Sequence, residues 1–197
     1  MTRYPKTPHL PWSSVTDPDD IVLYSCNQFE KNDIVITEKM DGENCLITKN
    51  KILLKDRNIK KDVDEKLLAN ALQIQKRIGE NTTVVIESLY HNLAINYNAL
   101  ESKIFGISYW EKDTCMSWDL TTTFFDSINI AHPPILYEGS WDMKVIIDLN
   151  SKISLSEFRE GYVMRIKKEF QEKNFNSSIA KYVKPFFVQK RIPSFEW

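Results

Sequence analysis

The residues best able to do chemistry in this chain are the tetrapeptide Lys39-Met40-Asp41-Gly42, which follows the short β-branched segment 34–38. A lysine amine acts as a nucleophile when neighbouring cations or burial lower its pKa enough to populate the neutral form. Asp41 can accept hydrogen bonds from a sugar or orient the lysine, and Gly42 lets the backbone approach a ligand closely. On its own, this short motif fits a solvated turn equally well.

Further candidate residues follow the tetrapeptide in order along the chain. They are Arg57, Glu87, the segment 105–110, Glu160-Gly161-Tyr162-Val163-Met164-Arg165 and Lys181-Tyr182-Val183-Lys184. Taken singly, each fits a structural role, such as an exposed charge pair or the cap of a strand end. Their chemical meaning therefore depends on whether the fold brings them together.

The elements that must position these residues are mainly short strands. β-Branched and alternating segments predict strands over 33–38, 45–48, 51–54, 82–87, 103–110, 161–166 and 179–183. Helical spacing predicts a helix over 64–77, another over about 119–128, and a third that starts near Ser140. We expect one α+β domain of mainly antiparallel sheets flanked by helices over residues 1–197. Four prolines make residues 1–20 an extended arm.

Composition limits the function classes. The chain has 197 residues, with 26 lysines and arginines against 27 acidic residues, so its net charge of -1 creates no global field for a polyanion. Three scattered cysteines and three scattered histidines predict neither disulfides nor a zinc site. The sequence shows no signal peptide and no membrane span, so we expect a cytoplasmic protein without a membrane partner, with a monomer favoured.

A local polyanion surface is nevertheless predicted near the C-terminus. Its basic residues are Lys167, Lys168, Lys173, Lys181, Lys184, Lys190 and Arg191, interleaved with Phe170, Phe175, Phe186 and Phe187. Cations for phosphates and aromatic faces for unpaired bases are what single-strand recognition uses. Core packing is an equally good reading of the phenylalanines.

The order of these motifs resembles the covalent nucleotidyltransferases, whose pattern is K-x-D-G, then E-G-x-V, then K-x-[VK]-K. The chain is most similar to the ATP-dependent RNA ligases of the second phage type, in a compact stand-alone form. Leu10-Pro11-Trp12 and Ser117-Trp118-Asp119 also resemble that family. The likeness covers nearly the whole chain and implies an ATP-grasp-like nucleotidyltransferase domain.

The resemblance implies a role for each catalytic candidate. Lys39 would attack the α-phosphorus of ATP, expel pyrophosphate and hold AMP as a phosphoramidate. Lys181, together with Lys184, would neutralise the α-phosphate oxygens and lower the pKa of Lys39. Glu160 would hold a divalent cation, Mg²⁺ or Mn²⁺.

The resemblance also implies how the nucleotide is held. Glu87 and Arg57 match positions that bind the ribose hydroxyls and neighbouring groups, and Glu38 matches a position at the adenine. The aromatic residue that the family stacks on adenine falls at Ile107, so either Ile107 makes an apolar contact or Phe105, on the same strand face, takes over the stacking.

The implied function is an ATP-dependent RNA ligase that seals a 5′-phosphate to a 3′-hydroxyl through lysyl-AMP. A GTP-using capping-type transferase and a catalytically silent RNA-end-binding protein remain alternatives, and DNA is not excluded as an acceptor. Val183 occupies the place of a second lysine, which makes Lys181 the stronger candidate. The sequence ends soon after this motif, so we expect no separate C-terminal RNA-binding domain.

Overall fold

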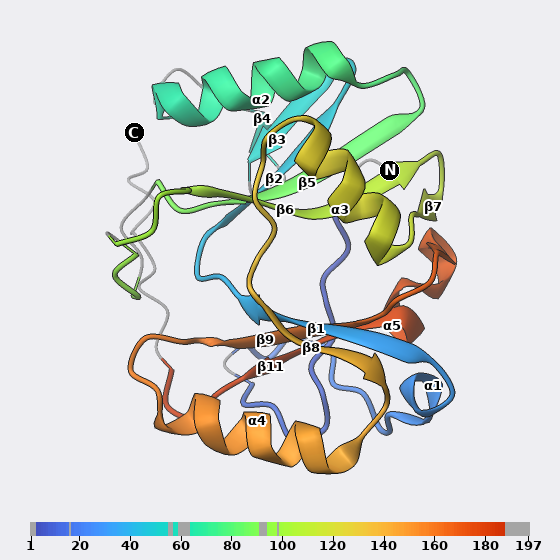
Figure 1. Cartoon of the computed structure of the whole chain (residues 1–197), viewed down its shortest axis with the longest axis vertical. Coiled ribbons are helices and arrows are strands. Elements are labelled where there is room, and N and C mark those ends of the chain that lie inside the picture. Colours follow the sequence, from blue (N-terminus) through green and yellow to red (C-terminus); the bar gives the residue numbers. More distant parts are fainter. Residues whose placement is uncertain are drawn as a thin grey trace.

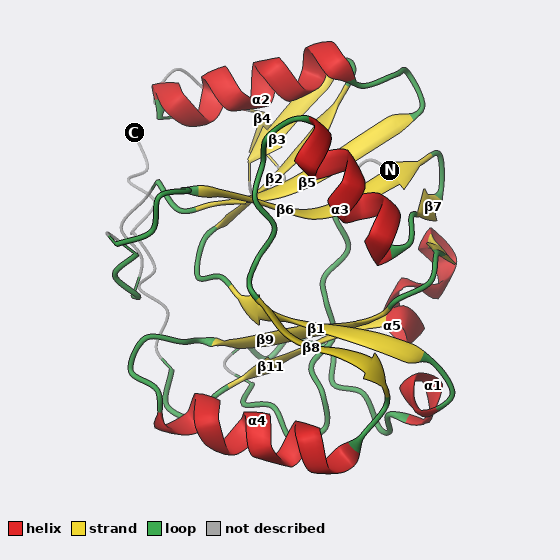
Figure 2. Ribbon diagram, viewed as in Figure 1, coloured by secondary structure: helices red, strands yellow, loops and turns green. Residues whose placement is uncertain are grey.

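The computed structural model describes residues 3–15, 17–54, 57–58, 64–90, 94–97 and 99–187. Its strands form two antiparallel sheets that face each other, with helices on their outer faces (Figure 1 and Figure 2). The predicted α+β class is confirmed. Within the described residues, no helix is both long and apolar enough to cross a membrane.

The smaller sheet joins strands from both halves of the chain. Its order is β11 (Ile179–Val183), β9 (Gly161–Ile166), β1 (Asp33–Lys39) and β8 (Ile135–Ser140). Three of these strands were predicted, and two of them have the predicted bounds. β1 and β9 run antiparallel from the pair Ile34 and Ile166 to the pair Lys39 and Gly161. This register places the start of the E-G-x-V motif beside the end of the strand that carries Lys39.

The larger sheet contains the central part of the chain. Its order is β10 (Phe170–Gln171), β7 (Thr114–Cys115), β6 (Ile104–Glu111), β5 (Thr82–Ser88), β2 (Glu43–Thr48), β3 (Lys51–Leu54) and β4 (Arg57–Asn58). The predicted hairpin of β2 and β3 pairs Cys45 with Leu54 and Thr48 with Lys51. β5 then pairs with both β2 and β6, so the strand that carries Glu87 is central and held on both sides.

The helices flank the two sheets, and the three longest cover the outer faces (Figure 2). They are α1 (Asn27–Glu30), α2 (Glu65–Arg77), α3 (Trp118–Ser127), α4 (Met143–Leu155) and α5 (Phe175–Ser178), with a 3₁₀ turn at Glu172–Asn174. α2 begins after Asp64, whose carboxylate accepts hydrogen bonds from the amides of Lys66 and Leu67. α2 and α3 lie on the larger sheet and α4 on the smaller one (Figure 1).

The third predicted helix starts later than expected. Ser140 is the last residue of β8, so the predicted helix near Ser140 is present but begins three residues later. The helix instead begins at Met143, where the Asp142 carboxylate accepts a hydrogen bond from the amide of Lys144. β8 was missed because the sequence around two prolines shows no strand alternation, whereas pairing with β1 holds it extended.

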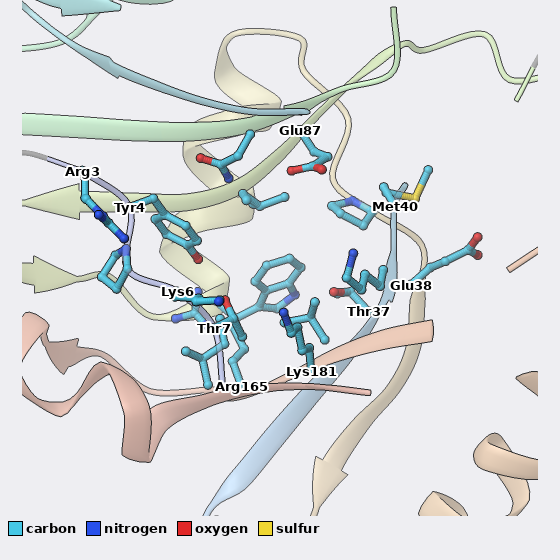
Figure 3. Close-up of a pocket in the computed structure, with 18 residues that line it drawn as sticks. Arg3, Tyr4, Lys6, Thr7, Thr37, Glu38, Met40, Glu87, Arg165 and Lys181 are labelled. Atoms are coloured by element: carbon cyan, nitrogen blue, oxygen red, sulfur yellow. The ribbon is translucent and has the colours of Figure 1, made fainter. Parts of the chain in front are cut away.

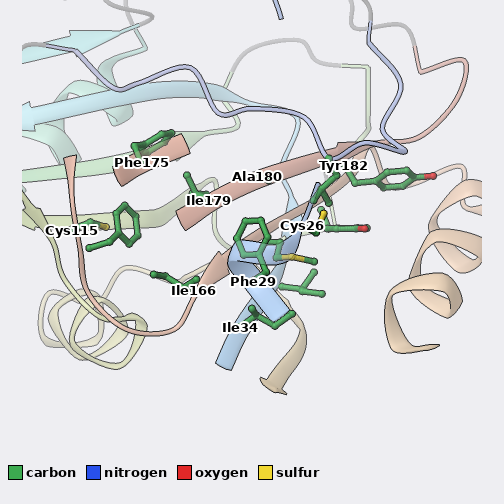
Figure 4. Packing of buried hydrophobic residues seen from close by; sticks show 14 of the residues in the cluster. Cys26, Phe29, Ile34, Cys115, Ile166, Phe175, Ile179, Ala180 and Tyr182 are labelled. Atoms are coloured by element: carbon green, nitrogen blue, oxygen red, sulfur yellow. The ribbon is translucent and has the colours of Figure 1, made fainter. Parts of the chain in front are cut away.

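Strand alternation sorts side chains between the core and the cleft. On β5, Val84 and Ile86 pack in a cluster with residues of α2 and α3, while Val85 belongs to the cluster that includes the smaller sheet. Because side chains alternate between faces, Glu87 shares the inner face with Val85. The cluster around the smaller sheet includes Phe29, Ile34, Phe175 and Tyr182 (Figure 4).

The N-terminal arm docks along the edge of the smaller sheet. The amide of Lys181 donates to the carbonyl of Pro8, and the amide of Leu10 donates to the carbonyl of Lys181, both at 2.8 Å. Leu10 is fully buried in the main core, and the indole Nε1–H of Trp12 donates to the hydroxyl of Tyr162. The arm therefore continues the sheet beyond β11.

Gly161 allows β9 and β11 to approach each other, and we expect its replacement to separate them. A Cβ at Gly161 would lie 1.8 Å from the carbonyl oxygen of Tyr182, whereas one at Gly79 would meet nothing closer than 3.6 Å. Gly161→Ala should therefore lower the free energy of unfolding by about 2 kcal/mol, a typical cost of overpacking. Urea denaturation measures this change. An equal effect of the control Gly79→Ala would contradict the explanation.

Candidate nucleotidyl-transfer site

A cavity of about 500 Å³ lies between the two sheets (Figure 3). The predicted site residues that line it are Glu38, Lys39, Glu87, Ile107 and Lys181. They come from four strands, β1, β5, β6 and β11. In Figure 3, Glu87 reaches in from one wall and Lys181 from the opposite wall.

Lys39 and Glu160 form a close ion pair at this cavity. Lys39 ends β1, Glu160 directly precedes β9, and the Nζ of Lys39 lies 2.7 Å from Oε2 of Glu160. Side-chain exposure is 19% for the lysine and 5% for the glutamate, so solvent screens the pair weakly. The β1–β9 register brings together two motifs that lie 121 residues apart.

The prediction that neighbouring cations lower the pKa of Lys39 was wrong for the protein without nucleotide. Burial lowers this pKa, but the carboxylates of Glu160, Glu87 and Asp41 more than offset burial and hold it above its ordinary value. A carboxylate beside an ammonium group stabilises the charged form. Lys39 is therefore an ammonium ion at neutral pH and must lose a proton before it can act as a nucleophile.

Glu87 faces the same amine from the larger sheet. Burial raises the pKa of its carboxyl to about 7, against the opposing influence of Lys39. The carboxylate is hydrogen-bonded to the backbone of Gly42 and the side chain of Asn44, the residue paired with Glu87 across β2 and β5. These contacts fix the position of Glu87 next to the K-x-D-G turn.

Asp41 and Gly42 hold the turn that follows Lys39. The carboxylate of Asp41, fully buried, accepts hydrogen bonds from the amides of Ala94 and Ile95 at 2.7 and 3.2 Å. A Cβ on Gly42 would lie 2.7 Å from the carbonyl oxygen of Ser88, so the close approach that requires glycine includes the end of β5. Both residues thereby fix the distance between Lys39 and the strand that carries Glu87.

Lys181 belongs to a second charged group, which includes the N-terminal arm. Its Nζ lies 3.7 Å from Oδ1 of Asp20, and the Nζ of Lys6 lies 3.1 Å from the same oxygen. The other oxygen of Asp20 is 3.0 Å from Nε2 of His9. Burial lowers the pKa of Lys181, partly offset by Asp20. Nothing in the sequence around Asp20 indicated that its carboxylate would hold these two lysines.

The candidate adenine contacts differ in whether they line the cavity. Ile107 lines it, whereas Phe105 is buried among Met40, Leu89, Ile95 and Tyr97. Glu38 also lines it and forms an ion pair with Arg159, with 3.2 Å between Oε2 and Nε. Burial raises the pKa of Glu38 despite this partner. Of the two candidate contacts to the base, the apolar residue Ile107 is thus the one on the cavity wall, and the aromatic residue Phe105 is not among the lining residues.

Of the two remaining predicted nucleotide contacts, only Lys184 has a described side chain. Arg57 lies on β4, beside Leu54 of β3, and its side chain falls outside the described structure. The ammonium of Lys184 donates to the carbonyl of Ser156 and lies 5.7 Å from the ring centre of Phe187. Lys184 is thereby engaged away from the cavity wall.

The sequence interpretation missed the residues at one end of the cavity. Arg3, Tyr4, Lys6 and Thr7 line it, together with Trp118 and Arg165. The guanidinium carbon of Arg165 lies 5.6 Å from the ring centre of Trp118, so this arginine is buried against an aromatic ring rather than exposed. No local pattern marks the arm as a cavity wall, because its position depends on pairing with β11.

The predicted basic and aromatic surface is only partly present. Phe170 and Phe175 are buried against Trp110 in the core, so neither ring is available to unpaired bases. Lys167 forms ion pairs with Asp119 and Glu138. Phe186 is fully exposed, and Lys190 and Arg191 lie outside the described residues.

The carboxylates at the cavity can supply only some of the ligands of a divalent cation. Among the described residues, no group of three or more histidine, cysteine or acidic side chains is arranged to hold a metal by itself. Mg²⁺ commonly uses one or two carboxylates and completes its shell with water and phosphate oxygens. Glu160, and Glu87 across from it, fit that mode of binding.

Solved structures with the same fold are ligases. An archaeal ATP-dependent RNA ligase is 13% identical with a TM-score of 0.64, over 92% of this chain and 48% of its own. A Naegleria gruberi RNA ligase mutant, solved with ATP and Mn, is 10% identical with a TM-score of 0.54, over 81% and 51%. An Aquifex aeolicus protein assigned as an ATP-dependent DNA ligase is 18% identical with a TM-score of 0.57, over 81% and 46%. The chain spans about half the length of these structures.

A family model gives the direct assignment. No curated protein matches the chain, but the model described as RNA ligase matches residues 32–183. This segment runs from the start of the strand that carries Lys39 to the end of the strand that carries Lys181. It contains the Lys39–Glu160 ion pair and most of the chain, and the protein therefore belongs to the RNA ligase family.

Proposed function

We propose that this protein is an ATP-dependent RNA ligase, with Lys39 as the residue that takes up AMP. The observation that carries the proposal is the convergence of Lys39, Glu87 and Lys181 on one cavity, with Glu160 paired to Lys39, in a chain of the RNA ligase family. ATP as the nucleotide is supported by the ATP-dependent and ATP-bound relatives.

Several side chains act in the first chemical step, the transfer of AMP to Lys39. The nitrogen of Lys39 attacks the α-phosphorus, an N–P bond forms, and the bond to the pyrophosphate oxygen breaks. Lys181 neutralises charge on the phosphate oxygens. Glu87 accepts hydrogen bonds from the ribose hydroxyls, and Ile107 contacts the base from the larger sheet. These assignments use side chains that already face the cavity.

A divalent cation, Mg²⁺ or Mn²⁺, would be held by Glu160 and would supply positive charge that neutralises phosphate oxygens. With a cation held there, Glu160 would stabilise the ammonium form of Lys39 less strongly. Before the reaction, the carboxylates of Glu160 and Glu87 hold the Lys39 amine in place as an ammonium ion. The RNA substrate would have a 5′-phosphate, which receives AMP, and a 3′-hydroxyl, which displaces it.

Incubation with ATP and Mg²⁺ should add one adenylyl group to the protein, measured by intact-mass spectrometry. Lys39→Arg keeps a positive charge beside Glu160 but offers no amine that loses its proton at accessible pH, so it should abolish the adduct. Lys152→Arg, an exposed control on α4, should leave it unchanged. Absence of an adduct with every divalent cation would reject the proposal, and a larger yield with GTP would favour a capping-type enzyme.

Replacement of Glu160 should lower the pKa of Lys39. In Glu160→Gln the carboxylate that stabilises the ammonium is lost, so the neutral amine appears at lower pH than in the wild type. The pH dependence of Lys39 acetylation by trace acetic anhydride, followed by peptide mass spectrometry without nucleotide or metal, reports this pKa. Lys152 in the same samples is the internal control. An unchanged or higher pKa of Lys39 in the variant would show that Glu160 does not govern its protonation.

Because only the neutral amine attacks, adduct formation in the wild type should become faster as pH rises from about 6 to 9. The raised pKa of Lys39 predicts this direction. The initial rate of adduct formation at saturating ATP and Mg²⁺ measures it. A rate that falls across this range would mean that another group, and not the Lys39 amine, limits the step.

A further inference from the structure

The N-terminal arm adds a wall to the site beyond β11. Backbone hydrogen bonds join Lys181 to both Pro8 and Leu10, so the arm runs parallel to β11 along the edge of the smaller sheet. The order across this sheet is therefore β8, β1, β9, β11 and then the arm. Lys39 lies on β1 and Lys181 on β11, and the arm brings a further cation, Lys6, to the edge beyond β11.

Lys6 and Lys181 are held close together by one buried carboxylate. Both ammonium groups approach Oδ1 of Asp20, at 3.1 and 3.7 Å, and the side chain of Asp20 is only 7% exposed. Lys6 also lies 3.9 Å from Asp17. Both lysines line the cavity, and Figure 3 shows them on the same wall, opposite Glu87. Asp20 fixes the two cations, and His9 in turn contacts the second oxygen of Asp20.

We propose that Lys6 and Lys181 form a subsite for the pyrophosphate part of the nucleotide. This inference rests on the proposed function, which places the α-phosphorus at Lys39. The β- and γ-phosphates carry most of the charge of ATP, and Lys181 and Lys6 offer cations in the direction that leads away from β1 and β9. Paired ammonium groups suit a polyanion of two linked phosphates.

The subsite acts on the leaving group. When the N–P bond to Lys39 forms, the bridging oxygen between the α- and β-phosphates departs with the electron pair of the broken bond. Lys6 and Lys181 stabilise the charge that pyrophosphate then gains. In the reverse reaction they position pyrophosphate for attack on the adenylated lysine. Sealing of a pre-adenylated RNA end involves no pyrophosphate and does not use Lys6.

Direct binding tests the subsite without catalysis. Isothermal titration of the full chain with inorganic pyrophosphate, in the presence of Mg²⁺, should show a Kd about tenfold higher for Lys6→Gln than for the wild type, as expected for loss of a charge-assisted contact. Lys6→Arg should bind like the wild type, and so should Lys152→Gln, which removes an exposed lysine on α4. A Kd for Lys6→Gln within about twofold of the wild type would overturn the subsite.

Kinetics separates this role from a structural one. Lys6→Gln should slow adduct formation from ATP and pyrophosphate-driven loss of the adduct by about tenfold, while sealing of pre-adenylated RNA stays at the wild-type rate. Equal losses in all three reactions would show that Lys6 only supports the fold. Failure of the wild type to form any adduct would reject the proposed function, whereas the pyrophosphate titration would still decide whether the subsite exists.

Discussion

The ion pair between Lys39 and Glu160 is the interaction on which the site depends. It joins the end of β1 to the start of β9, and both side chains are largely removed from solvent. A buried ion pair is held only when both partners are present, because removal of one leaves an uncompensated charge at a cost of about 3–5 kcal/mol. The pair therefore fixes the distance between the K-x-D-G and E-G-x-V motifs, and Glu87 approaches the same amine from the other sheet.

Much of this arrangement was predictable because it follows from strand periodicity. The segments that became β1, β9 and β11 are short and β-branched, and side chains on a strand alternate between its two faces. Once β1, β9 and β11 pair antiparallel, alternation places Lys39, Val163 and Lys181 on one face toward the larger sheet. The positions of the motif residues in the sequence therefore predict the sheet face on which each side chain lies, as well as the chemistry that it can perform.

The remainder depended on contacts between distant segments that leave no local pattern. The arm was predicted only as extended, and its role as a cavity wall arises from backbone pairing with β11. The pKa of Lys39 was predicted with the wrong sign because the carboxylates of Glu160, Glu87 and Asp41 outweigh burial, and Glu87 belongs to the other sheet. Phe170 and Phe175 looked available for bases, but Trp110 lies against both in the core.

The described lysines of the cavity wall contact carboxylates of the protein before any nucleotide enters. Glu160 contacts Lys39, and Asp20 contacts both Lys181 and Lys6, so these lysines are held in fixed positions. Positions fixed in advance reduce the reorganisation that accompanies charge transfer in the reaction. In the proposed reaction the same carboxylates would oppose catalysis, because Glu160 stabilises the ammonium form of Lys39 and Asp20 would compete with phosphate for Lys6 and Lys181. In the proposed function, phosphate oxygens of the nucleotide would replace the carboxylates at the lysines, while Glu160 would hold the divalent cation and so stabilise the ammonium form of Lys39 less.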